Sequence, residues 1–127
     1  MPSSEIVLRR IWDSHYSSAT RSIHPKAFAN DADEPDRHSV SREIYTSAST
    51  LQSLAPEPER FGVVAVAVLD YNEMDQVVEH DPIDEDFGHC NAIGSKTSRV
   101  KEYLRKHAIV RIAPPPPRQP GPVQPPV

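Results

Sequence analysis

The strongest constraint on the fold is one uninterrupted apolar segment, GVVAVAVL, at residues 62–69. Its small and β-branched side chains favour an extended strand, and both faces of that strand are apolar. A strand of this kind is buried on both sides, which indicates a central strand in a sheet that is covered on both faces. The rest of the chain therefore has to supply the strands beside it and the layers that cover it.

Weaker patterns predict the remaining strands and helices. Alternating apolar residues predict strands at 5–12 and 39–45, and shorter strands at 89–94 and 108–112. Capping residues and apolar spacing predict three helices. One at roughly 48–55 is capped by Thr46 or Ser47, one runs from Asn72 to about Val78, and one that ends near His107 is capped by Ser95, Thr97 or Ser98. A short helical turn is also expected in HPKAF at 24–28. The rest of 13–40 and the segment HDPIDEDFG are polar and read as loops.

The order of these elements predicts an α+β fold, a single small domain with a mixed β-sheet and two or three short helices. Of the 14 prolines in the 127-residue chain, eight lie between Pro114 and Val127. This composition predicts a globular domain at 1–113 followed by a disordered, proline-rich tail at 114–127. The strands 5–12 and 108–112 are expected at exposed sheet edges, which could pair with a second copy of the chain, so a homodimer is an alternative to a monomer.

Cysteine content and hydropathy give an expectation about location. The chain has one cysteine, Cys90, and a single thiol fits a reducing compartment. Its longest apolar run, Val63 to Leu69, is seven residues long, whereas a membrane span needs about 20. No apolar signal segment opens the chain. We expect a soluble cytoplasmic protein without a membrane partner.

Charge is segregated along the chain. Between Asp70 and Asp86 there are eight acidic residues and no Lys or Arg, whereas six basic residues and one acidic residue lie between Lys96 and Arg111. The net charge of −4 argues against general binding to nucleic acid. This pattern favours a module that binds another protein through charged faces and its tail. The predicted contact residues are Arg99, Lys101, Arg105, Lys106, Asp84, Glu85 and Asp86, together with the R-x-x-P-x-x-P motif of Arg111, Pro114 and Pro117.

Four neighbouring side chains have the chemistry of zinc ligands, namely His80, Asp81, His89 and Cys90. If 89–94 is a strand, His89 and Cys90 point to opposite faces and cannot easily hold one ion. Cys90 as a nucleophile would need a base from another histidine, and a lone cysteine is more often a small buried side chain. Phosphate-binding glycine loops are absent from the sequence. We therefore expect a non-catalytic protein without a cofactor, whose reactive side chains do not converge.

An alternative comes from REIYTSASTLQSL at 42–54, which resembles a stretch of RES-domain toxins in which a tyrosine-containing strand runs into a helix. The order of VLRRI, IYTS and GVVAVAVLD is also similar, although the family's glutamate after the helix falls here at Pro56. RES-domain proteins resemble ADP-ribosyltransferases and consume NAD. The resemblance implies that Arg9 or Arg10, Tyr45 and Ser47 bind or act on NAD. A toxin–antitoxin or defence component is compatible with either reading.

Overall fold

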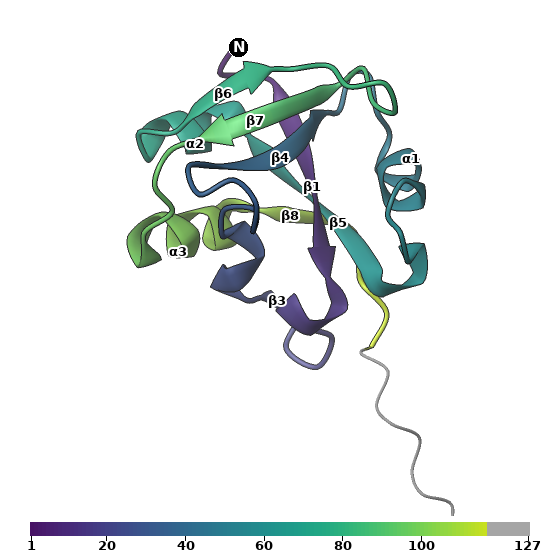
Figure 1. Cartoon of the computed structure of the whole chain (residues 1–127). Coiled ribbons are helices and arrows are strands. Elements are labelled where there is room, and N and C mark those ends of the chain that lie inside the picture. The colour runs from purple at the N-terminus through teal and green to yellow at the C-terminus, as the bar shows by residue number, and fades with distance from the viewer. Residues whose placement is uncertain (117–127) are drawn as a thin grey trace, which may run out of the picture.

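The computed structural model describes residues 1–116 and confirms the α+β class (Figure 1). One six-stranded sheet contains β1 (Ile6–Trp12), β4 (Arg37–Arg42), β5 (Phe61–Ala67), β6 (Val77–His80), β7 (His89–Ile93) and β8 (Ile109–Ile112). The α-helices are α1 (Ala48–Ser53), α2 (Val68–Glu73) and α3 (Ser98–His107). A small hairpin of β2 (Tyr16–Ser17) and β3 (Ser22–Ile23) and three short 3-10 helices, η1 (Asp13–His15), η2 (Pro25–Phe28) and η3 (Pro58–Arg60), complete the described chain.

The strand order is β6-β7-β4-β1-β5-β8, and the sheet is antiparallel at every pairing rather than of mixed direction. The predicted burial of β5 is confirmed, because its first six residues are all buried. The strand at 5–12 is not an edge as expected, since β1 lies between β4 and β5. The edges are β8, as predicted, and β6.

Two separate hydrophobic clusters explain why β5 is apolar on both faces. Alternating β1 residues divide between them: Val7 and Ile11 belong to the larger cluster and Leu8 to the smaller one. The larger cluster is completed by η2, α2 and α3, and the smaller one by Leu51 of α1. Figure 1 accordingly shows α2 and α3 on one side of the strands and α1 on the other.

For two helices the capping residue is one of the candidates that the sequence offered, and the start of the third was predicted wrongly. Ser47 accepts a hydrogen bond from the Thr50 amide at the start of α1, and Thr97 accepts one from the Val100 amide at the start of α3. The helix expected at 72–78 instead begins at Val68 and ends at Glu73, because α2 packs on the core through Val68 and Tyr71. The chain then turns at Asp75, which has a positive φ of 58°, into β6.

After β8, the C-terminal part of the described chain packs against β5. Pro114 is buried, and a Cβ atom on Gly62 would overlap its ring and the carbonyl of Ile112. The body of the domain therefore includes Pro114, which the sequence assigned to the tail. The remainder of the predicted tail from residue 117 on, with Pro117, lies outside the described residues. Within residues 1–116, no helix has the length and apolar character that crossing a membrane requires.

Candidate functional site

A cleft of about 700 Å³ opens where β1 and β4 separate. The two strands pair only at Val7↔Arg42 and Leu8↔Ser41, whereas β1 pairs with β5 along its whole length. Beyond Leu8 the sheet is therefore split. The lining comes mainly from β1, β4, β7, α1 and two loops, and it includes Arg9, Arg10, Trp12, Asp31, Ser39, Ser41, Leu51, Leu54, Ile83, Glu85, Asp86 and His89.

The Arg9 side chain bridges the split between the strands. Its guanidinium donates to the carbonyls of Ala27 at 2.7 Å, Ser39 at 2.9 Å and Ala29 at 3.1 Å. Asp31 lies 3.5 Å from Nη2 and supplies the counter-charge. Burial lowers the pKa of Arg9, and the acceptors around it compensate for the lost water. Arg9 therefore has a structural role, in which its hydrogen bonds connect β1 to η2 and β4.

Arg10 points to the other face of β1, and its guanidinium has fewer hydrogen-bond partners than that of Arg9. Its guanidinium makes a single hydrogen bond among residues 1–116, from Nη1 to the carbonyl of Leu51 at 3.3 Å, and it forms no ion pair there. Burial, and secondarily repulsion from Arg9, lowers the pKa of Arg10. The cleft thus contains a half-buried cation with unused N–H donors.

Asp86 forms part of the cleft wall but is not the exposed contact residue that the sequence predicted. Its carboxylate is buried and accepts hydrogen bonds from the hydroxyls of Ser41 and Thr46 and from the amide of Gly88. These three donors satisfy the hydrogen-bonding capacity of the buried carboxylate and hold the loop against β4. Asp84 and Glu85, in contrast, are exposed as expected.

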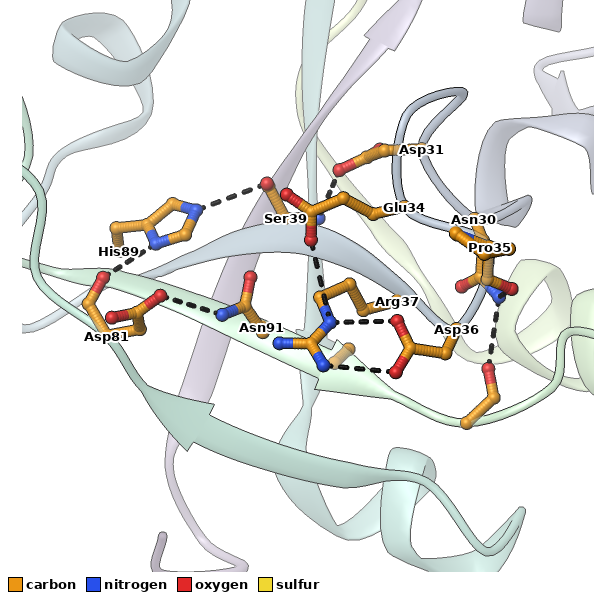
Figure 2. A network of polar contacts seen from close by, with 12 residues as sticks. Asn30, Asp31, Glu34, Pro35, Asp36, Arg37, Ser39, Asp81, His89 and Asn91 are labelled. Carbon is orange, nitrogen blue, oxygen red and sulfur yellow. Dashed lines mark hydrogen bonds and ion pairs between the residues drawn. The ribbon is translucent and has the colours of Figure 1, made fainter.

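A serine and a histidine meet on the cleft side of β4 and β7 (Figure 2). His89 pairs in register with Ser41, and its ring reaches diagonally so that Nε2 lies 3.1 Å from Oγ of Ser39. The other ring nitrogen, Nδ1, lies 2.7 Å from the main-chain oxygen of Asp81. The Asp81 carboxylate is turned to Asn91, 2.9 Å away. One hydroxyl and one imidazole therefore lie within hydrogen-bonding distance on this side of the sheet.

The four candidate metal ligands do not come together. Cys90 points into the core on the face opposite to His89, as strand alternation predicts, and burial raises the pKa of its thiol to about 11. Nε2 of His80 donates to the Phe87 carbonyl, 2.8 Å away, and the His80 ring packs on the Tyr45 and Phe87 rings. In the described part of the chain, no group of three or more His, Cys, Asp and Glu residues could hold an ion.

The residues implied by the RES resemblance are not gathered around the cleft. Arg10 lines the cleft, but Tyr45 and Ser47 do not. Tyr45 is half-exposed, with the Arg42 guanidinium 4.9 Å from its ring centre. Ser47 caps α1. Only the arginine of the implied set therefore faces the cleft.

Several predicted partner contacts are occupied within the domain. On α3, Arg105 and Lys106 both pair with Glu102, while Arg99 is exposed and Lys101 half-exposed. Arg111 forms a bidentate salt bridge with Glu43, in which Nε and Nη2 donate to the two carboxylate oxygens at 2.9 and 3.1 Å. Since Pro114 is buried as well, two members of the proline motif already have partners.

Neither Ser39 nor the cleft was predicted from the sequence. The available signal was the polar alternation at 37, 39 and 41, which puts the serines on one face of β4. The partner, His89, is 50 residues away and could not be assigned from spacing.

Comparison with protein-family models, with curated proteins and with solved structures finds no match for this chain. Its function therefore has to be inferred from the residues of the cleft.

Proposed function

We propose that the protein is a binding module that recognises an anionic group of a partner protein in the cleft between β1, β4 and α1. The observation that carries this proposal is the state of Arg10, a half-buried guanidinium with one hydrogen bond and no ion pair within residues 1–116. A guanidinium fork matches the geometry of a carboxylate or phosphate, and such charge-assisted pairs are the strong hydrogen bonds in proteins.

The neighbouring carboxylates do not satisfy Arg10. Asp86 already accepts from three donors. Asp31 pairs with Arg9 and accepts the Ser39 amide at 2.9 Å. Glu85 is exposed to solvent, where its charge is screened. An incoming anion would therefore meet a cation whose charge is partly desolvated and locally unpaired.

Exposed apolar side chains among the residues that line the cleft support a protein partner. Trp12, Leu54 and Ile83 are 41%, 39% and 44% exposed. A buried ionic contact flanked by an aromatic and two aliphatic side chains is typical of the centre of a protein interface. The partner would thus present an acidic or phosphorylated residue between apolar ones. Exposed Arg99 and Lys106 on α3 would contribute long-range attraction to such a partner.

The test is an NMR titration of the Arg10 Nε–H and Trp12 indole N–H signals. The probes are phosphate, the peptide acetyl-Leu-Glu-Leu-amide and its Gln counterpart. We expect the two anionic probes to shift both signals, with the Glu peptide binding about tenfold more tightly than the Gln peptide. Arg10→Gln should abolish that difference, and the matched control Arg21→Gln, at an exposed arginine outside the cleft lining, should keep it. Shifts confined to α3, or no shift at Arg10 with any probe, would contradict the proposal.

A second candidate is the NAD-consuming enzyme that the RES resemblance implies. Arg10 favours it, because the same free guanidinium could pair with a pyrophosphate. Tyr45 and Ser47, however, would have to act from outside the cleft lining. Release of nicotinamide from NAD, lost in both Arg10→Ala and Tyr45→Ala, is the result expected for this enzyme. Release that is absent, or indifferent to Tyr45→Ala, would remove it.

A further inference from the structure

The contact between Ser39 and His89 has a defined direction. A main-chain oxygen only accepts hydrogen bonds, so the contact with the carbonyl of Asp81 requires a hydrogen on Nδ1 of His89. In the neutral ring, Nε2 then carries a lone pair, and it faces Oγ of Ser39 at 3.1 Å. The Ser39 hydroxyl therefore donates to the imidazole. This is the arrangement of a nucleophile, a base and a group that orients the base.

The main chain of Ser39 is held on both sides. Its amide donates to Oδ2 of Asp31 at 2.9 Å, and its carbonyl accepts from Nη1 of Arg9 at 2.9 Å. Figure 2 shows that His89 is likewise anchored at Nδ1. Both side chains are half-buried. A pair with fixed geometry can be oriented toward a bound substrate without further ordering of the protein.

A substrate could reach the pair, because Ser39 and His89 line the same cleft as Arg10. Ser41, the neighbouring hydroxyl on this face of β4, is engaged differently, since it donates to the buried carboxylate of Asp86. Among the cleft residues, Ser39 is thus the hydroxyl that contacts an imidazole and not a carboxylate.

We propose that Ser39 and His89 form an acyl-transfer site that hydrolyses a carboxylic ester whose acyl part carries an anionic group held by Arg10. The choice of an anionic ester rests on the proposed anion site, whereas the role of the pair does not. In the first step, Oγ of Ser39 bonds to the ester carbonyl carbon and its proton moves to Nε2 of His89. The bond to the leaving oxygen breaks, and that oxygen takes the proton from Nε2, which releases an alcohol and leaves Ser39 acylated.

Water completes the reaction. It attacks the acyl carbon while Nε2 takes one of its protons, the bond to Oγ breaks, and Nε2 returns the proton to Ser39. The net reaction is ester plus water to carboxylic acid plus alcohol, with no redox change. Arg10 would act in both steps by holding the anionic end of the acyl group.

The experiment uses the full chain and two probes, neutral para-nitrophenyl acetate and anionic mono-para-nitrophenyl glutarate. We expect a burst of nitrophenol and an acyl group located on Ser39 by peptide mass spectrometry. Ser39→Ala and His89→Gln should each lower turnover about a hundredfold, while the exposed Ser49→Ala on α1 should leave it unchanged. Ser39→Cys should still be acylated, which separates loss of the nucleophile from loss of folding.

Arg10→Gln distinguishes the two proposals. It should raise KM for the glutarate half-ester about tenfold and leave the acetate unchanged. Acylation of Ser39 with equal sensitivity of both esters to Arg10→Gln would support the acyl-transfer site and contradict the anion site. Nitrophenol release that persists at the same rate in Ser39→Ala, or acylation found only on His89 or lysines, would overturn the acyl-transfer site.

Discussion

Nε2 of His38 lies 2.8 Å from the hydroxyl of Tyr71, and both side chains are completely buried. The other ring nitrogen of His38 lies 3.2 Å from the carbonyl of Phe28 and 3.3 Å from that of Ala29. Because carbonyls only accept, Nδ1 carries the hydrogen, and the tyrosine hydroxyl donates to Nε2. The neutral ring is therefore fully satisfied and links β4 to η2 and α2.

This contact predicts a loss of stability in acid. Burial, followed by repulsion from Arg9 and Lys96, holds the pKa of His38 well below its usual value. An unfolded histidine binds a proton at about pH 6.5, whereas folded His38 does not. The stabilising effect is thus fully present above that pH and is lost as the pH falls below it. The free energy of unfolding should fall by as much as about 1.4 kcal/mol per pH unit for this proton.

Urea denaturation across this pH range measures the effect. His38→Gln should flatten the dependence on pH, while the exposed His107→Gln should preserve it. An unchanged slope in His38→Gln would show that other groups are responsible. His15 contributes with the same sign, since burial also lowers its pKa, so the slope should be reduced and not abolished.

Cys90 is predicted to be unreactive in the folded protein. Its sulfur is buried, 3.5 Å from Sδ of Met1 and 3.4 Å from the carbonyl of Gly88, and the raised pKa of about 11 leaves little thiolate at neutral pH. Iodoacetamide should label the native protein far more slowly than the urea-unfolded protein, as followed by mass spectrometry. Rapid labelling of the native thiol would contradict this burial.

The elements that the sequence predicted well are those whose pattern is complete within a few residues. The strand β5 is apolar throughout, and α1 and α3 begin at hydroxyl residues that cap them. In contrast, β6 has only two apolar residues and exists through its pairing with β7, which no local pattern encodes. Asn72 resembled a helix cap, but tertiary packing of Val68 and Tyr71 moved the helix earlier.

The candidate site was less predictable because its residues are far apart in sequence. Strand alternation puts Arg9 and Arg10 on opposite faces of β1, but their different roles depend on which acceptors meet each guanidinium. Arg9 meets carbonyls of η2 and β4, whereas Arg10 meets one carbonyl of α1. The split between β1 and β4 that creates the cleft also leaves no mark in the sequence.

Gly62 is predicted to be required for the close approach of the chain end to β5. A Cβ atom there would overlap the carbonyl of Ile112 and the ring of Pro114, both of which are attached to main chain that cannot easily move. Gly62→Ala should therefore destabilise the domain by about 1–3 kcal/mol. Thermal unfolding measures this loss. Pro114→Ala combined with Gly62→Ala should cost less than the sum of the single changes if the overlap is responsible.

The last prediction concerns Asp86, which holds the acidic loop against β4. Asp86→Ala leaves the hydroxyls of Ser41 and Thr46 and the amide of Gly88 without their acceptor, so the expected loss is about 3 kcal/mol. Asp86→Asn is the matched control, because its amide oxygen can still accept from Thr46 and Gly88 while its NH₂ donates to the Ser41 oxygen. Its expected cost is about 1 kcal/mol.

Chemical denaturation of the two variants separates the buried hydrogen bonds from the charge of Asp86. Because Asp86 is part of the cleft wall, Asp86→Ala should also weaken binding of the Glu peptide, while Asp86→Asn should preserve it. Equal destabilisation by Ala and Asn would mean that the negative charge itself stabilises the loop. The carboxylate would then act on the nearby guanidinium of Arg10, whose charge it favours, and not through the three donors alone.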